Sequence, residues 1–316
     1  MKKHDTPMRG ARITGYGTAL PEKILTNADL EEMVDTTDEW IVERSGIRER
    51  RVGGSTSGLA IEAAQKALDM AGVAPEEIDM LLLATTTPDD QVPGTAPTVQ
   101  NELGLRCGAM DLNAACSGFV YGLVNAHGLI GAGADKVLLI GSEALSRIVD
   151  YTDRGTCILF GDGAGAVVLE STDGPGQLLG WDLNSLGNLR HILYAEIGST
   201  MKMEGKEVFR QAVKAMVTSA EAAIENAGVD VQDIKLVVPH QANVRIIDSA
   251  MKKLGLPADR AASVLEWTGN TSSASIPLAL ADALDDGRVD DGDLVLLVGF
   301  GAGMTSGSAV LRWGAQ

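Results

Sequence analysis

The sequence predicts an α/β protein built from two duplicated halves. Residues 67–73 have the pattern of a helix that ends at a glycine, and an apolar strand follows at 78–83. The same pattern returns 156 residues later, as a helix end at 223–229 and an apolar strand at 234–238. This pair is the first observation that favours a duplication.

A second repeated pair agrees with the first. The apolar strand at 137–141 matches the strand at 295–299, offset by 158 residues, and each precedes a Gly/Ala-rich turn and a further apolar strand. Helices, glycines and apolar strands also recur by chance in α/β proteins, so one pair would not distinguish chance from duplication. Two pairs at nearly equal offset favour duplicated halves.

The join between the halves is predicted in the turn-rich segment 171–176. We therefore expect an N-terminal half over residues 1–173 and a C-terminal half over 174–316. The other predicted elements, in chain order, are a helix through 121–129, a strand at 166–169, a helix after Ala242 and a helix through 278–284.

Composition restricts the class of protein. The 316 residues are 45% hydrophobic, enough for a substantial core, and no apolar run approaches the roughly 18–20 residues of a membrane span. Residues 1–7 lead into no signal-like stretch, so we expect a cytoplasmic enzyme. A formal charge of −17 argues against nucleic acid as a partner. Three cysteines without CxxC spacing argue against both a disulfide framework and a zinc site.

His240 stands where the apolar strand within 236–239 ends and an amphipathic stretch begins. Open α/β sheets place their chemistry at the carboxyl ends of strands, so a histidine there is well placed to act. Alone, it is equally well explained as a structural residue.

Cys116 lies among small residues, directly before a helical pattern. A helix N-terminus carries partial positive charge, which favours the nucleophilic thiolate over the thiol. The alternative is a buried small hydrophobic residue, the usual state of a free cysteine and our interpretation of Cys107 and Cys157.

Asn270 lies in a run rich in small polar residues, 268–277, ahead of a helical pattern. By itself it is explained as a turn or helix-cap residue. The glycine-rich turn at 299–307 offers backbone N–H groups to an oxyanion, or it is simply a tight connection.

Together these residues resemble β-ketoacyl-acyl carrier protein synthase III. The likeness rests on Cys116 in its small-residue setting, on Pro-His-Gln-Ala-Asn at 239–243 and on Gly-Asn-Thr-Ser at 269–272. It extends over almost the whole chain, through segments at 37–42, 44–50, 152–156 and 160–165. The resemblance implies the thiolase fold, with two similar halves around mixed sheets in a layered α/β arrangement, and a homodimer.

The resemblance also implies the reaction. Cys116 takes an acyl group from an acyl-coenzyme A primer, which then condenses with malonyl-acyl carrier protein as carbon dioxide is lost. His240 and Asn270 donate hydrogen bonds to the enolate that decarboxylation creates. The backbone N–H groups of Cys116 and Ala302 receive a second oxyanion, and Ala302 stands where glycine is commoner. Coenzyme A enters as a substrate thioester, and neither a separate cofactor nor a metal is expected.

Binding residues follow from the same resemblance. Trp40, Arg44 and Arg154 are expected along the coenzyme A tunnel, and Val92 and Phe300 at the acyl pocket. Val92 is smaller than the aromatic residue of short-primer members, which suggests longer or branched primers. An acidic carrier protein needs a basic docking surface on this acidic chain. The candidates for that surface are Arg210, Lys214, Arg245, Lys252 and Lys253.

Four other classes of protein share some of these sequence features. A papain-like protease shares the Cys, His, Asn order but lacks these surroundings, and a dinucleotide-binding protein needs a glycine spacing that 161–165 does not have. A non-catalytic subunit of the fold would generally have lost the nucleophile. A thiolase-fold acyltransferase or a specialised-metabolism condensing enzyme, of the polyketide type, is the alternative that stays open.

Overall fold

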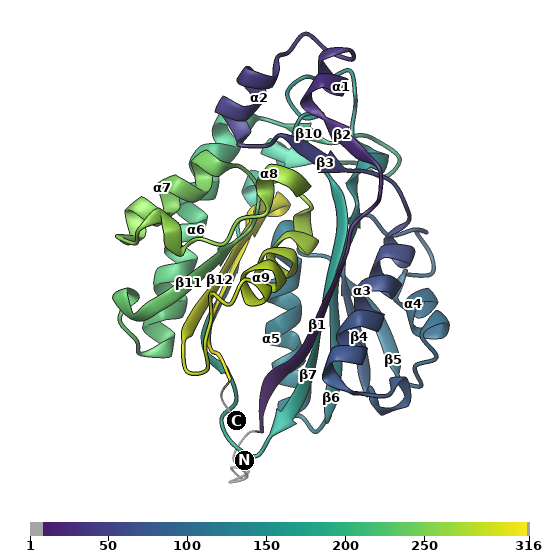
Figure 1. The fold of residues 1–316 in the computed structure, drawn as a ribbon, viewed down its shortest axis with the longest axis vertical. Coiled ribbons are helices and arrows are strands. Elements are labelled where there is room, and N and C mark those ends of the chain that lie inside the picture. Colours follow the sequence, from purple (N-terminus) through teal and green to yellow (C-terminus); the bar gives the residue numbers. More distant parts are fainter. Residues whose placement is uncertain (1–8, 315–316) are drawn as a thin grey trace.

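The computed structural model describes residues 9–314, which form two mixed sheets with helices between and outside them (Figure 1). The first sheet has the strand order β1-β7-β6-β4-β5 and the second β11-β12-β13-β8. Their strands are β1 (Gly10–Ala19), β4 (Met80–Ala84), β5 (Gly108–Leu112), β6 (Lys136–Ala144), β7 (Asp162–Thr172), β8 (Leu178–Ser185), β11 (Ile234–Pro239), β12 (Leu294–Gly301) and β13 (Thr305–Arg312).

The two sheets repeat one topology, which confirms the predicted duplication. In the first, β1 and β7 are antiparallel, β7 and β6 antiparallel, and β6 and β4 parallel. In the second, β8 and β13, then β13 and β12, then β12 and β11 follow the same sequence of directions. The repeat recognised along the chain is therefore a repeat in space.

Helices separate and cover the sheets in layers. Between the sheets lie α5 (Gly118–Gly131) and α9 (Ser275–Asp285), and their apolar side chains form the central core (Figure 1). Outside the first sheet lie α3 (Thr56–Ala71) and α4 (Ala96–Glu102), and outside the second lie α6 (Gly205–Ala227) and α7 (Val244–Leu254). The shorter elements are α1 (Asn27–Glu31), α2 (Asp38–Ser45), α8 (Leu265–Thr268), β2 (Ile24–Thr26), β3 (Glu49–Arg51), β9 (Leu193–Tyr194) and β10 (Lys202–Met203).

Corresponding helices end in the same way. Both α3 and α6 end at a glycine in the left-handed conformation, Gly72 at φ 67° and Gly228 at φ 66°, which glycine adopts without a Cβ penalty. Each turn then leads the chain into a buried parallel strand, β4 or β11.

The boundary between the halves is a proposal. The first sheet ends with β7 at Thr172 and the second begins with β8 at Leu178, so we place the boundary near residue 173. Residues 1–8, on which the expectation about a leader rests, lie outside the described residues. Within 9–314, none of the helices has the length and apolar character to cross a membrane.

Candidate active site

A cavity of about 960 Å³ contains the three predicted catalytic side chains in its wall. Cys116 comes from the first half, and His240 and Asn270 come from the second. Since 124 residues separate Cys116 from His240 along the chain, the site exists only because the two halves pack against each other.

Cys116 lies in a 3₁₀ turn, Ala115–Ser117, which connects β5 to the first turn of α5. Ala115 has φ 49°, an uncommon conformation for a residue with a Cβ. The end of β12 approaches this turn closely, because a Cβ built on Gly301 would lie 2.5 Å from the Cys116 nitrogen. Gly301 is therefore required for the nucleophile turn to meet the second half.

Cys116 lines the cavity, and the residue is intermediate between buried and exposed. Burial raises the pKa of Cys116 to about 12, although the neighbouring Ser272 side chain acts in the opposite direction. Cys116 therefore precedes a helix as predicted, and its activation by the helix N-terminus stays a prediction that burial opposes.

His240 follows the last residue of β11, and its backbone N–H donates to the carbonyl of Val298 at 2.8 Å. Its Nδ1 lies 2.7 Å from Ser275 Oγ, and Phe300 packs edge-on with ring centroids 5.3 Å apart. Burial lowers the pKa of His240 to about 3, so the imidazole is neutral at physiological pH.

Asn270 is held by its backbone and by one end of its amide. Its N–H donates to Leu159 O at 2.8 Å, and its carbonyl accepts from Gly161 N at 2.9 Å. The side-chain Oδ1 accepts from Ser272 N at 2.9 Å, which leaves the two hydrogens on Nδ2 for a substrate. A turn residue by sequence is thus an oriented donor in the structure.

Arg50 supports the Asn270 turn and was not recognised in the sequence. It is fully buried, and its guanidinium donates to the Ile158 carbonyl and, at 2.6 Å, to Asn27 Oδ1. Its aliphatic part packs so closely that a Cβ on Gly269 would lie 2.9 Å from Arg50 Cγ. Desolvation lowers the pKa of Arg50 to about 10, so the group remains charged at neutral pH.

Glu143 is a second buried group that the sequence did not reveal. It is the second-last residue of β6 and is fully buried. Its carboxylate accepts from Thr87 Oγ1 at 2.6 Å, Thr86 Oγ1 at 2.9 Å and Ser273 Oγ at 2.8 Å. Ser273 belongs to the 3₁₀ turn Ser272–Ala274, between Asn270 and α9. Glu143 thereby joins the loop after β4 to the segment that carries Asn270.

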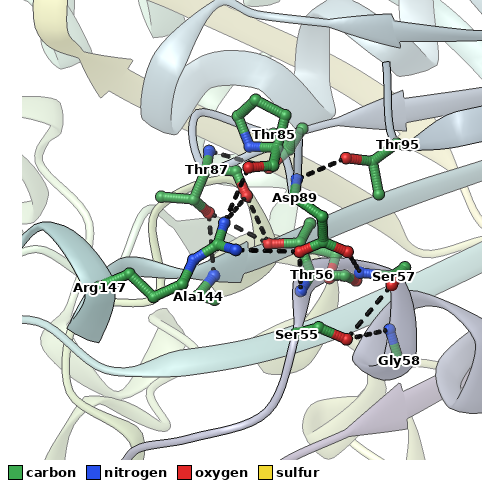
Figure 2. Close-up of polar contacts among 12 residues, drawn as sticks. Ser55, Thr56, Ser57, Gly58, Thr85, Thr87, Asp89, Thr95, Ala144 and Arg147 are labelled. Atoms are coloured by element: carbon green, nitrogen blue, oxygen red, sulfur yellow. Dashed lines mark hydrogen bonds and ion pairs between the residues drawn. The ribbon is translucent and has the colours of Figure 1, made fainter. Parts of the chain in front are cut away.

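The loop after β4 is anchored again further along (Figure 2). The Asp89 carboxylate accepts from Thr56 N at 3.0 Å and Ser57 N at 2.9 Å, at the N-terminus of α3, and pairs with Arg147 at 3.1 Å. Thr95 Oγ1 accepts from the Asp89 N–H at 2.8 Å. Desolvation by itself would raise the pKa of Asp89, but the hydrogen bonds from Ser57 and Thr56 lower it overall.

The two residues expected to supply the oxyanion donors, Cys116 and Ala302, both line the cavity. Ala302 opens the turn between β12 and β13, whose left-handed residues are Gly303 at φ 76° and Met304 at φ 39°. Ala302 itself is outside the left-handed region. The methyl group that replaces a commoner glycine therefore causes no backbone strain.

Two of the three predicted coenzyme A residues line the cavity, and the third, Arg154, contacts one of them. Trp40 and Arg44 line the cavity from α2, with the Arg44 guanidinium 5.4 Å from the indole centroid. The Arg154 guanidinium lies 4.1 Å above the same ring. The Trp40 ring thus has two cations near it.

The predicted docking residues lie on two helices that pack together, α6 and α7 (Figure 1). Arg245, at the start of α7, lines the cavity and lies 5.6 Å from the Phe209 ring. Arg210 pairs with Glu207 at 2.6 Å. Lys214 on α6 and Lys252 and Lys253 at the end of α7 are exposed and do not line the cavity. Two basic residues that the sequence did not single out, Arg190 and Lys206, do line it.

The two predicted acyl-pocket residues have different surroundings. Phe300 is buried in the cavity wall beside His240. Val92 is 85% exposed and is absent from the wall of this chain's cavity. Its role in the pocket therefore stays a prediction.

Comparison with known proteins agrees with this geometry. The sequence profiles of 3-oxoacyl-[acyl-carrier-protein] synthase III match residues 110–187, and residues 224–313 for the C-terminal region. The β-ketoacyl-[acyl-carrier-protein] synthase III of Sinorhizobium medicae is 47% identical, over 95% of this chain and 98% of its own. The crystal structure of the Aquifex aeolicus 3-oxoacyl-[acyl-carrier-protein] synthase III superposes with a TM-score of 0.94 at 44% identity, over 96% of this chain and 100% of its own.

A structure from a different pathway is also similar. The priming β-ketosynthase of the R1128 polyketide biosynthetic pathway superposes with a TM-score of 0.93 at 35% identity, over 99% of both chains. Fold and cavity together define a condensing enzyme with the thiolase fold. The chain belongs to the β-ketoacyl-[acyl-carrier-protein] synthase III family, which confirms the predicted fold class, family and acyltransferase class.

Proposed function

We propose that the protein condenses an acyl group from an acyl-coenzyme A primer with malonyl-acyl carrier protein, the step that initiates fatty acid biosynthesis. One observation carries the proposal: Cys116, His240 and the oriented amide of Asn270 line a single cavity that the two halves form together.

The first half-reaction transfers the primer to Cys116. The sulfur, once deprotonated, attacks the thioester carbonyl, and the carbonyl electrons move onto oxygen. The N–H groups of Cys116 and Ala302 are the proposed donors to that oxyanion. When the carbonyl re-forms, the bond to the coenzyme A sulfur breaks and the thiolate of coenzyme A leaves. The high pKa of the buried thiol means that proton removal has to accompany primer binding or attack.

The second half-reaction extends the acyl group by two carbons. The bond between the malonyl carboxylate and the methylene carbon breaks, carbon dioxide leaves, and the electron pair moves toward the thioester oxygen as an enolate. His240 and Asn270 Nδ2 are the proposed donors to this oxygen. The enolate carbon then attacks the acyl carbonyl, and the bond to Cys116 breaks to release the β-ketoacyl product.

The proposed binding roles extend this scheme. Trp40 stacks on the adenine of coenzyme A, while Arg44 and Arg154 bind the base or its phosphates. The basic residues of α6 and α7, with Arg190 and Lys206, receive the acidic carrier protein. The enzyme acts as a cytoplasmic homodimer, and exposed Val92 reaches the acyl pocket of the partner subunit. No cofactor takes part beyond the coenzyme A of the primer.

One experiment tests the reaction. Purified protein is incubated with a panel of acyl-coenzyme A primers and malonyl-acyl carrier protein, and mass spectrometry follows Cys116 and the products. We expect acylated Cys116, then carbon dioxide release and a β-ketoacyl-carrier protein. Acylation without carbon dioxide release would instead support acyl transfer to another acceptor. A preference for a specialised carrier protein would support a polyketide role, which the similarity to the R1128 priming enzyme makes worth testing.

A further inference from the structure

Within residues 9–314, the hydrogen bond with Ser275 is the only one that the ring nitrogen Nδ1 of His240 makes. Ser275 is the first residue of α9, is fully buried, and places its Oγ 2.7 Å from Nδ1. Neutral histidine has one ring proton, so the partner of Nδ1 decides which nitrogen faces the substrate with a hydrogen.

Two hydrogen-bond arrangements compete for the single Ser275 hydroxyl proton. Apart from Nδ1, the acceptor within reach is the carbonyl of Ser272, at 2.8 Å. That carbonyl already accepts the backbone N–H of Ser275, so it does not depend on the hydroxyl. Ser275 Oγ can in turn accept the N–H of Gln241 at 3.3 Å. Donation to Nδ1 therefore leaves Nδ1, the Ser272 carbonyl and the Gln241 N–H each with a partner.

We propose that Ser275 is a positioning residue, which donates its hydroxyl proton to Nδ1 and so keeps the ring proton of His240 on Nε2. This proposal rests on the proposed function, because only a decarboxylating thioester needs a donor at that position. In the opposite arrangement Nδ1–H donates to Ser275, and a bare Nε2 lone pair faces the thioester oxygen. Two lone pairs would then repel, and only Asn270 would stabilise the enolate.

Ser275→Ala removes the donor to Nδ1 while His240 and Asn270 remain. We expect malonyl decarboxylation by the acylated variant to fall about tenfold or more, the effect of one lost hydrogen bond at a transition state. Acylation of Cys116 should fall far less, because the thioester oxyanion of that step is held by backbone N–H groups. Ser275→Thr, which keeps the hydroxyl, should recover part of the decarboxylation.

Ser142→Ala is the matched control. Ser142 is also fully buried, and its hydroxyl donates to the Thr56 carbonyl at 2.8 Å, away from His240. It loses a comparable buried hydrogen bond, so we expect any loss of activity to affect both half-reactions equally. If Ser142→Ala instead lost decarboxylation far more than acylation, as expected for Ser275→Ala, the effect would come from general weakening of the core. That result would overturn the proposal.

Nitrogen-15 NMR of labelled histidine gives a readout that does not depend on activity. In the wild type we expect a protonated signal for Nε2 and an unprotonated one for Nδ1 of His240, assigned by its loss in His240→Gln. In Ser275→Ala the two signals should move toward each other as the tautomers mix. A wild-type signal with the proton on Nδ1 would overturn the Ser275 proposal, even if the enzyme decarboxylates. Failure of the wild type to release carbon dioxide would instead count against the proposed function.

Discussion

The hydroxyl of Ser273 donates to the carboxylate of Glu143 at 2.8 Å, inside a fully buried contact between the two halves. The donors to this carboxylate in the described chain are hydroxyls and backbone N–H groups, including those of Thr86 and Thr87. One buried acid thus connects the loop after β4 to the turn that follows Asn270. Its hydrogen bonds hold two segments of the site in register.

We expect Glu143→Gln to destabilise the protein by about 2 kcal/mol. The amide NH₂ group would face hydroxyl and N–H donors instead of accepting from them, which leaves buried polar groups without partners. The measurement is the shift in the urea unfolding midpoint, with exposed Glu76→Gln as the control. Equal midpoints for the two variants would contradict this role.

The reactivity of Cys116 should rise with pH well above neutrality. Because burial raises the pKa of the thiol to about 12, the thiolate fraction increases about tenfold for each pH unit below that value. We expect the rate of iodoacetamide modification, followed on the Cys116 peptide by mass spectrometry, to climb from pH 7 to pH 9. A plateau within that range would mean that the N-terminus of α5 outweighs burial.

Arg50→Lys should lower both the stability and the activity of the enzyme, because Arg50 supports the Asn270 turn. A lysine cannot contact both Ile158 O and Asn27 Oδ1 as the guanidinium does, and we expect a loss of about 2 kcal/mol in unfolding free energy. Decarboxylation should fall more than acylation, since Asn270 serves the former. Arg48→Lys, on an exposed side chain that pairs with Glu266, is the control. Identical effects of the two variants on the half-reactions would contradict this prediction.

Arg245→Glu should impair use of the carrier protein more than use of the primer. Reversing an exposed charge at the cavity mouth should raise the KM for malonyl-acyl carrier protein about tenfold and reduce its salt dependence. Lys235→Glu, at the opposite end of β11 from His240, provides the control. If acylation from acyl-coenzyme A fell as much as condensation, Arg245 would belong to the coenzyme A site instead.

Val92→Phe tests whether Val92 enters the acyl pocket of the partner subunit in the proposed dimer. Because Val92 is 85% exposed in the described chain, the change should leave stability within about 0.5 kcal/mol. If the residue enters the partner subunit's pocket, activity with long and branched primers should fall relative to acetyl-coenzyme A. An unchanged primer profile across the panel would exclude Val92 from the pocket.

Much of the fold was readable from local patterns. Helix, glycine and strand repeated at nearly constant offset because each half uses the same capped helix and buried strand, and Gly72 and Gly228 end their helices at φ 67° and 66°. The family motifs likewise predicted Cys116, His240 and Asn270, which line one cavity, because each lies in a short segment of distinctive composition. No such signal marked Ser275, Glu143 or Arg50, since serine, glutamate and arginine occur at many positions that have no role in a site.

By itself, the sequence determined the α/β class, the duplication and the segments that supply the site, because periodicity, glycine stops and compact motifs act within a few residues. Only the tertiary structure decided the chemical state of those segments. Burial, which depends on the packing of both halves, raises the pKa of the Cys116 thiol and lowers that of the His240 imidazole. Long-range hydrogen bonds orient the Asn270 amide and give Nδ1 of His240 its partner, and contacts between residues distant in sequence leave no local pattern to read.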